Sequence, residues 1–192
     1  CIRDRLKVLN LSFNKLRSLD RPFFTAENAL VQLSLESNVL INIDPQFFKD
    51  LSNLQDLNLS GNLFTDVPAG IGYMHSLKSL DLGKNNIHFI DGTKFEGLTN
   101  LLGLRMVDNF ITNLTQTTFY HLPSLQILNL ASNRLKYIHK NAFTHNTMIH
   151  AIRLNNNQLE NSFGLFKSLK LLIWLDIGFN HIHEFNFNDI PI

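Results

Sequence analysis

LKSLDLGKNNI, residues 77–87, is the stretch that decides the fold. Leucines stand at its first, fourth and sixth places, an asparagine at the ninth and an isoleucine at the eleventh. Leu80 and Leu82 alternate with Asp81, which is the period-two pattern of a short strand with one buried face. The asparagine that follows suits a sharp turn, because its amide offers donors and an acceptor to backbone groups buried there. The stretch therefore predicts a short strand that runs into a buried turn.

The same pattern recurs eight times along the chain at nearly constant spacing. Successive units begin 24, 24, 23, 24, 24, 24 and 23 residues apart, at Leu6, Leu30, Leu54, Leu77, Leu101, Leu125, Ile149 and Leu172. We number positions in each unit from this first residue. The pattern Leu-x-x-Leu-x-Leu-x-x-Asn-x-Leu at such a period is identified as the leucine-rich repeat. It predicts an α/β-type repeat solenoid, a horseshoe with short parallel strands on its concave face and a mostly irregular convex side.

Two columns of residues recur with the units. Position 9 is always asparagine, and we expect these side chains to form a hydrogen-bonded ladder inside the turns: Asn14, Asn38, Asn62, Asn85, Asn109, Asn133, Asn157 and Asn180. A phenylalanine near position 19 is expected to close the outer side of most units: Phe24, Phe48, Phe95, Phe119, Phe143 and Phe166. The third unit is one residue shorter and has Ile71 where its neighbours have phenylalanine.

The domain prediction is a single solenoid fragment over residues 1–192, with about eight repeats and no terminal caps. Each unit buries its apolar face only against its neighbours, so the first and last units are expected to expose apolar core. Cys1 is the only cysteine, so an intramolecular disulfide and a thiolate zinc site are excluded, and any disulfide partner lies outside the chain. The longest apolar run, residues 171–175, is far too short to span a bilayer.

Composition argues against several classes of function. The net charge is +1 and the 17 basic residues are scattered, which argues against nucleic-acid binding. No nucleophile motif, phosphate loop or third glycine beside Gly70 and Gly72 is present, so we expect no enzyme, no cofactor and no small-molecule substrate. His88 and His183 fall four units apart, and His181 and His183 lack a third ligand nearby, so we expect no metal site.

Several less common stretches resemble the middle of insect Toll receptor ectodomains, especially long-ectodomain members such as Tollo and Eighteen-Wheeler. These stretches are DVP at 66–68, LKSLDLG at 77–83, LPSLQILNLA at 122–131, GLF at 164–166 and LIWLDI at 172–177. The resemblance implies a segment of a membrane-anchored receptor on the extracellular side of the plasma membrane. It also implies a secreted cystine-knot ligand of the Spätzle type, or another ectodomain, as partner, with roles in innate immunity, development or cell adhesion.

Candidate partner-binding residues lie on the predicted concave face, which such solenoids present to partners. They are Arg105, His150, Arg153, Trp174, Asp176 and Phe179. An exposed tryptophan beside an arginine is typical of a binding hot spot, and His150 and Phe179 are expected near it. A structural alternative is that Asp81 pairs with Arg105 and Arg153 with Asp176 across adjacent strands. Trp174 has its own alternative, packing against Ile173, Phe179 or a further repeat.

Three sequons mark candidate N-glycosylation sites at Asn10, Asn58 and Asn113. The first two read Asn-Leu-Ser within the repeat pattern itself, whereas Asn113 is expected in the turn after the asparagine corner, where a sugar has room. Glycans on Asn10 and Asn58 would obstruct the N-terminal half of the concave face. The leading functional hypothesis is a Toll-type recognition segment. The alternatives are an extracellular adhesion or structural protein without a signalling domain, and an intracellular scaffold or enzyme inhibitor.

Overall fold

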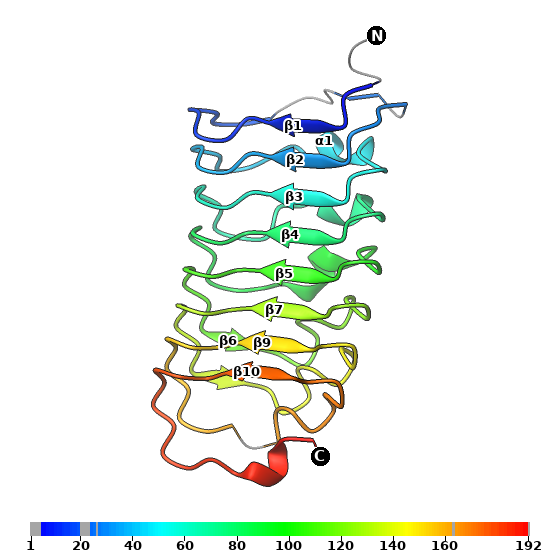
Figure 1. Cartoon of the computed structure of the whole chain (residues 1–192). Coiled ribbons are helices and arrows are strands. Elements are labelled where there is room, and N and C mark those ends of the chain that lie inside the picture. Colours follow the sequence, from blue (N-terminus) through cyan, green and yellow to red (C-terminus); the bar gives the residue numbers. More distant parts are fainter. Residues whose placement is uncertain (1–4, 20–23, 26, 163, 192) are drawn as a thin grey trace.

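The fold is a stack of short parallel strands, one per repeat, and a computed structural model describes residues 5–19, 24–25, 27–162 and 164–191. Cys1 lies outside the described residues. Eight parallel strands form one sheet in the order β1-β2-β3-β4-β5-β7-β9-β10 (Figure 1). Their bounds are β1 Val8–Asn10, β2 Gln32–Ser34, β3 Asp56–Asn58, β4 Ser79–Asp81, β5 Gly103–Arg105, β7 Ile127–Asn129, β9 Ala151–Arg153 and β10 Trp174–Asp176. The predicted solenoid of parallel strands is confirmed.

Every strand keeps the same register against its neighbour, so equivalent positions form rows across the sheet. Leu80 pairs with Leu57 on one side and with Leu104 on the other, and all three point inward and are buried. The residues at positions 3 and 5 flank this central leucine and point outward, because side chains alternate across a strand. We call the surface formed by positions 3 and 5 of the eight units the strand face.

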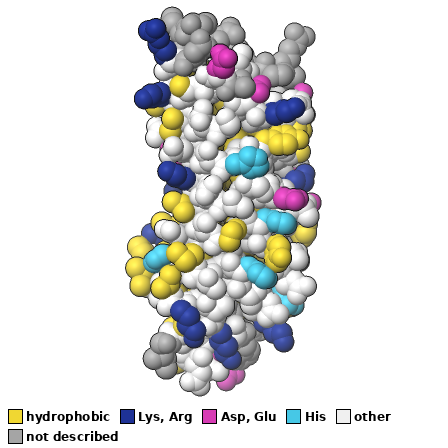
Figure 2. All heavy atoms as spheres, turned by 90° about the vertical axis from the view of Figure 1, so that its right-hand side faces the viewer, with side chains coloured by type: hydrophobic (Ala, Val, Ile, Leu, Met, Phe, Trp, Pro, Cys, Tyr) yellow, Lys and Arg dark blue, Asp and Glu magenta, His cyan; other side chains and the backbone are white. Residues whose placement is uncertain are grey.

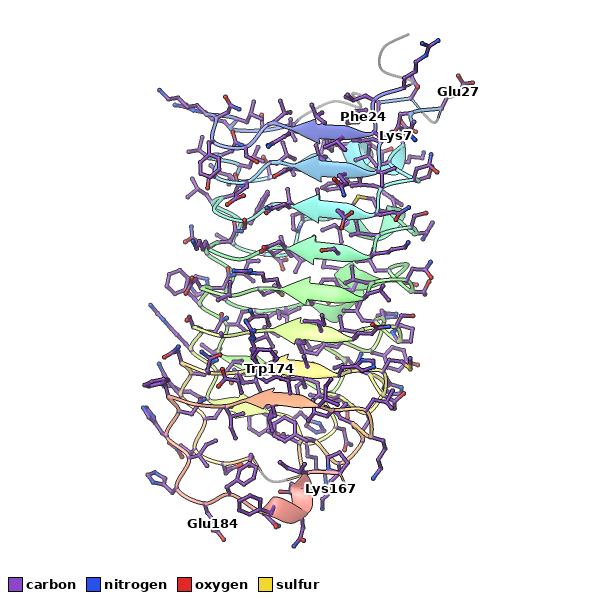
Figure 3. The ribbon with its side chains drawn as sticks, viewed as in Figure 1. Lys7, Phe24, Glu27, Lys167, Trp174 and Glu184 are labelled. Atoms are coloured by element: carbon purple, nitrogen blue, oxygen red, sulfur yellow. The ribbon has the colours of Figure 1, made fainter. Side chains whose placement is uncertain are left out.

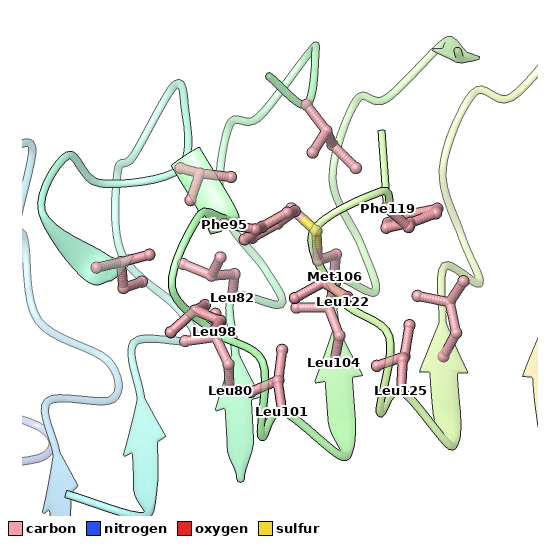
Figure 4. Close-up of a cluster of buried hydrophobic side chains, with 14 of the residues drawn as sticks. Leu80, Leu82, Phe95, Leu98, Leu101, Leu104, Met106, Phe119, Leu122 and Leu125 are labelled. Atoms are coloured by element: carbon pink, nitrogen blue, oxygen red, sulfur yellow. The ribbon is translucent and has the colours of Figure 1, made fainter. Parts of the chain in front are cut away.

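The core behind the sheet is filled by leucines and by the phenylalanine column (Figure 4). The rings of Phe119 and Phe143 stack 6.0 Å apart at an interplanar angle of 9°, and Phe143 and Phe166 repeat this arrangement at 6.4 Å. All six predicted members of the column are buried, and Ile71 fills the same place in the third unit. Both expectations are confirmed, because a residue repeated once per unit meets the same surroundings in each.

The outer side of the stack is mostly irregular, with short helical turns. These are α1 Pro45–Lys49 and the 3-10 turns η2 Ile71–Tyr73, η3 Gly92–Phe95 and η4 Phe187–Asp189. Asp44 and Asp91 cap α1 and η3 by accepting hydrogen bonds from backbone N–H groups. Among the described residues, no helix is both long and apolar enough to cross a membrane.

A second, two-stranded parallel sheet joins β6 Asn113–Leu114 to β8 Tyr137–Ile138. The sequence did not predict this sheet, and the expectation that Asn113 lies in a turn is wrong. Leu114 and Ile138 are buried and their neighbours Asn113 and Tyr137 are exposed, so the pair is a short strand with one buried face. Asn113 therefore presents its side chain to solvent from a strand.

The two outer strands are less well covered than the inner ones. Leu9 of β1 and Leu175 of β10 are partly buried, whereas Leu104 of β5 is fully buried. Among the described residues, each outer strand pairs with one neighbouring strand, so its inward leucine lies beside one strand instead of two. The absence of caps and the span of the domain stay predictions.

Candidate protein-binding surface

The asparagine ladder is confirmed in detail, and its role is structural. Asn109 donates from Nδ2 to the carbonyl of Met106 in its own unit, at 3.2 Å, and to that of Leu82 in the preceding unit, at 2.9 Å. Its Oδ1 accepts from the N–H of Ile87 at 3.0 Å. The other members follow the same scheme, except that Asn14, in the first unit, bonds only within its own turn. These amides are engaged in the corner and are not available to a partner.

Most side chains at position 5 of the strand face also have a structural task. In five units an asparagine or aspartate accepts a hydrogen bond from the backbone N–H two residues further on and so fixes the end of the strand: Asn10, Asn58, Asp81, Asn129 and Asp176. Asp176 therefore has a structural explanation as well as the predicted binding role. Arginine stands at this position in the fifth and seventh units, as Arg105 and Arg153, and cannot accept such a bond.

Arg105 and Asp81 form the predicted pair on adjacent strands. Arg105 Nε lies 3.4 Å from Asp81 Oδ2, and the arginine side chain is 56% exposed. Burial raises the pKa of Asp81 above its ordinary value of 3.8, although the N–H of Gly83 and the charge of Arg105 act in the opposite direction. The carboxylate is thus partly desolvated, while much of the guanidinium remains open to a partner.

The predicted pairing of Arg153 with Asp176 is wrong, although the two residues stand opposite each other on β9 and β10. The Arg153 guanidinium instead lies over the ring of Trp174, 4.5 Å from its centroid, which is the geometry of a cation–π contact. Trp174 is exposed by 53% on the strand face (Figure 3). Ile173 is 86% exposed, so the alternative of a buried packing partner is not supported on that side.

A hollow of about 500 Å³ opens on the C-terminal half of the strand face, over β4 to β10. Its lining combines the apolar or small residues Gly103, Ile127, Ala151 and Trp174 with the charged groups Asp81, Arg105 and Arg153. Three of the six candidate binding residues, Arg105, Arg153 and Trp174, therefore meet in one place. The lining residues that were not predicted have a signal in the sequence, because the side chain at position 3 is small in three of these units. They are Ser79, Gly103 and Ala151.

The other three candidates, Asp176, His150 and Phe179, do not line this hollow. His150 precedes β9, is half-buried, and uses its carbonyl to accept the N–H groups of Ile173 and Trp174. Phe179 follows β10 in a left-handed turn with φ 53° and is 84% exposed. Neither residue lines the hollow. His150 contacts the backbone of Trp174 at the start of the strands, whereas Phe179 follows the end of β10, so the two lie at opposite ends of the strands and their role in binding stays a prediction.

The three sequons differ in their surroundings. Asn58 is engaged on both sides: its Oδ1 accepts from the N–H and the hydroxyl of Ser60, and its Nδ2 donates to Glu36 Oε2 at 3.2 Å. Asn10 is exposed and accepts from the Ser12 N–H. Asn113 is exposed on β6, and no hydrogen bond within the described part of the chain engages its side-chain amide. Glycosylation of all three stays a prediction, and the geometry favours Asn113 over Asn58.

Several histidines lie on the flank where the chain enters the strands (Figure 2). Tyr120 packs edge-on against the rings of His121 and His145, at 5.1 and 4.5 Å. His75 belongs to the third unit, two units before that of His121, and its Nδ1 lies 3.1 Å from the Gly97 carbonyl oxygen. Within the described ranges, no group of three or more His, Cys, Asp or Glu side chains is placed to hold a metal ion.

Comparison with known proteins gives relatives among receptors. Toll-like receptor 7 of Drosophila melanogaster is 39% identical over 126 residues, which are 66% of this chain and 9% of that protein. The leucine-rich repeat-containing G-protein coupled receptor 5 of Xenopus tropicalis is 32% identical over 122 residues, 62% of this chain and 13% of the receptor. The chain thus spans about a tenth of the length of these relatives.

Solved structures give the same result for the fold. The Drosophila Toll–Spätzle complex matches with a TM-score of 0.89 and 25% identity over 97% of this chain and 27% of that one. The TLR13–ssRNA13 complex matches with a TM-score of 0.82 and 25% identity over 94% and 25% of the two chains. The chain is therefore similar to Toll-like receptor ectodomains. The leucine-rich repeat family model matches residues 4–64 and 103–159, more than half of the sequence, and the chain belongs to that family.

Proposed function

We propose that the chain is a protein-recognition segment of a Toll-type cell-surface receptor ectodomain, of the long-ectodomain insect type. Its partner would be a secreted cystine-knot ligand of the Spätzle type or another ectodomain. The similarity to the fly receptor and to the Toll–Spätzle structure supports this proposal. The observation that carries it is the exposed Trp174–Arg153 pair at the edge of an open hollow.

The chemistry of the strand face favours binding over catalysis. Tryptophan and arginine are the side chains that most often dominate the binding energy of protein interfaces. The core behind the face is filled by leucine and phenylalanine. The charged groups that line the hollow are one carboxylate and two guanidinium groups, without a nucleophile beside a base. Eight strands about 4.8 Å apart make a surface on the order of 35 Å long, which suits a protein partner.

An extracellular location forms part of the proposal. It is supported by the receptor relatives and by the exposed sequon at Asn113. The chain secreted from insect cells is expected to carry N-linked glycan, seen as a mass shift after enzymatic deglycosylation. Efficient secretion with all three sequons bare would count against this part of the proposal.

The binding part is tested with the secreted chain and a panel of purified cystine-knot ligands of the Spätzle type, by biolayer interferometry. Trp174→Ala is expected to weaken the binding of a ligand from this panel by about 30-fold, the effect of a hot-spot residue worth roughly 2 kcal/mol. Gln32→Ala, at the same position of β2 but outside the hollow, is the matched control. Failure of every ligand in the panel to bind, or equal binding by wild type and Trp174→Ala, would contradict the proposal.

A further inference from the structure

Gly103 lies in the middle of the strand face, and nothing in the fold explains why it is glycine. A Cβ atom added there would meet no atom within 4 Å, and Gly103 is not among the glycines with positive φ. Gly72 and Gly92, by contrast, lie against carbonyl oxygens of the next unit that a Cβ would strike. A glycine inside a strand weakens it and often marks a place where a ligand approaches the backbone closely.

The surroundings of Gly103 form a socket for an apolar side chain. Ser79 and Ile127 stand beside Gly103 on the neighbouring strands, in register with it. Ile127 is 57% exposed and, with Trp174, makes apolar walls around a floor that is lowered at Gly103 and Ala151. Contact with an apolar side chain of a partner would bury these exposed isoleucine and tryptophan side chains. Such burial contributes a favourable free energy of about 25 cal/mol for each Å² of apolar surface removed from water.

The charge beside this socket selects for an anionic neighbour. Arg105 and Arg153 line the hollow from the same row of positions, against the single carboxylate of Asp81. Arg105 and Gly103 are two residues apart on β5, so their outward directions are separated by about 6.6 Å. An extended partner segment has the same repeat, with side chains two residues apart on one face.

We propose that the hollow over Gly103 receives the apolar side chain of an extended, acidic segment of a protein partner, whose carboxylate two residues away binds Arg105 or Arg153. This inference rests on the proposed function, because it assumes that the strand face recognises protein, and it names the partner's chemistry. The planar guanidinium group of arginine has a geometry that fits a carboxylate and a phosphate equally well. Glu36, Asp56 and Asp81, on the same face or beside it, disfavour a long polyanion, so the peptide is the occupant that the charges favour.

Trp174 is the only tryptophan and lines the hollow, so its fluorescence reports binding without a label. The probe is a pentapeptide with leucine at its centre and glutamate two residues away on both sides, which fits either chain direction. Its controls replace leucine by glycine or both glutamates by lysine. The leucine–glutamate peptide is expected to change the emission saturably with a Kd on the order of 1 mM, as suits so small a ligand. Both control peptides should bind at least about fivefold more weakly, a difference of roughly 1 kcal/mol.

Variants of the secreted chain locate the binding. Gly103→Leu fills the socket and should reduce peptide affinity at least about fivefold, whereas Gly103→Ala, which has room for its methyl group, should stay close to wild type. A variant that combines Arg105→Gln and Arg153→Gln should remove the preference for glutamate over lysine. Gln32→Leu, at the equivalent position of β2, is the control that should change nothing. Circular dichroism and urea unfolding verify that each variant is folded.

The outcomes separate this inference from the proposed function. Absence of peptide binding, binding unaffected by Gly103→Leu, or a stronger response to a single-stranded RNA oligonucleotide than to the peptide would overturn the inference. The proposed function is judged separately by the cystine-knot panel. A cystine-knot ligand that binds wild type and Gly103→Leu equally would leave the proposed function standing and remove the socket from it. Peptide binding as expected, with no ligand from the panel bound, would support the socket and contradict the ligand class.

Discussion

Replacing one rung of the asparagine ladder tests how the repeat is held together. In Asn109→Ala, the N–H of Ile87 loses the Oδ1 that accepts it at 3.0 Å. Asn109 also donates to three carbonyls, those of Leu82, Met106 and Val107. Each of them keeps another partner, because they also accept from Asn85, Asn133 and the N–H of Lys84, respectively. One buried backbone N–H is therefore orphaned, while the three carbonyls lose only an additional hydrogen bond.

The expected cost follows from this inventory. An orphaned buried donor costs about 1–3 kcal/mol, and each hydrogen bond lost to a carbonyl that keeps another partner costs about 0.5 kcal/mol or more. Asn109→Ala should therefore lower the free energy of unfolding by about 3 kcal/mol. Asn14→Ala is the matched control, because Asn14 is exposed and makes only two bonds, both within its own turn. It should cost about 1 kcal/mol or less.

The assay is equilibrium urea unfolding of the secreted chain followed by circular dichroism. An unchanged slope with urea would show that both variants unfold as the wild type does, so that the midpoints compare directly. A loss below about 1 kcal/mol for Asn109→Ala, or equal losses for the two variants, would refute the reasoning. The hydrogen bonds of the asparagines would then contribute little to the stability of the turns, although the residue recurs in every unit.

Three further predictions concern the core, the charge pair and the sequons. Phe119→Ala removes a fully buried ring from the phenylalanine column and should cost about 3–5 kcal/mol by urea unfolding, whereas Phe187→Ala, at a ring that is 80% exposed, should cost little. Burial raises the pKa of Asp81, so the folded chain binds a proton at this carboxylate more tightly than the unfolded chain does. The wild type therefore gains stability as the pH falls from neutral through the raised pKa to about 3.8. Asp81→Asn keeps an oxygen acceptor but does not titrate, so the free energy of unfolding of the variant minus that of the wild type should be larger at pH 7 than at pH 4. A difference that stays constant or grows on acidification would contradict this prediction. Site mapping by mass spectrometry should find higher glycan occupancy at Asn113 than at Asn58, and the reverse order would show that the bonds of Asn58 do not limit glycosylation.

The periodic features could be predicted from sequence because each unit repeats its surroundings. A residue such as Asn109 or Phe119 occupies the same place as its equivalents one unit away, so spacing alone predicts its burial and its partners. The choice of partner on the strand face could not be predicted this way. Register places Arg153 opposite Asp176, yet the guanidinium lies over the ring of Trp174, a choice of partner that spacing along the chain does not specify.

The hollow is harder to predict from sequence, because it forms where a side chain is absent. In the sequence, Gly103 is one of the varying residues between the leucines of the repeat pattern. Only the open space above Gly103 in the structure distinguishes it from Gly72 or Gly92. The short β6–β8 sheet was missed for a different reason. Asn113 and Leu114 form a strand of two residues, too short for any alternation to be visible in the sequence.

The sharing of carbonyls in the asparagine ladder has a consequence for how such chains change in length. The carbonyl of Leu59 accepts from Asn62 in its own unit and from Asn85 in the next, although the third unit is one residue shorter. Each rung thus meets the same donor and acceptor on either side, whatever unit its neighbour happens to be. A unit duplicated or deleted whole would leave no rung without a counterpart. Genes for such proteins can therefore grow or shrink by entire repeats without a redesigned junction.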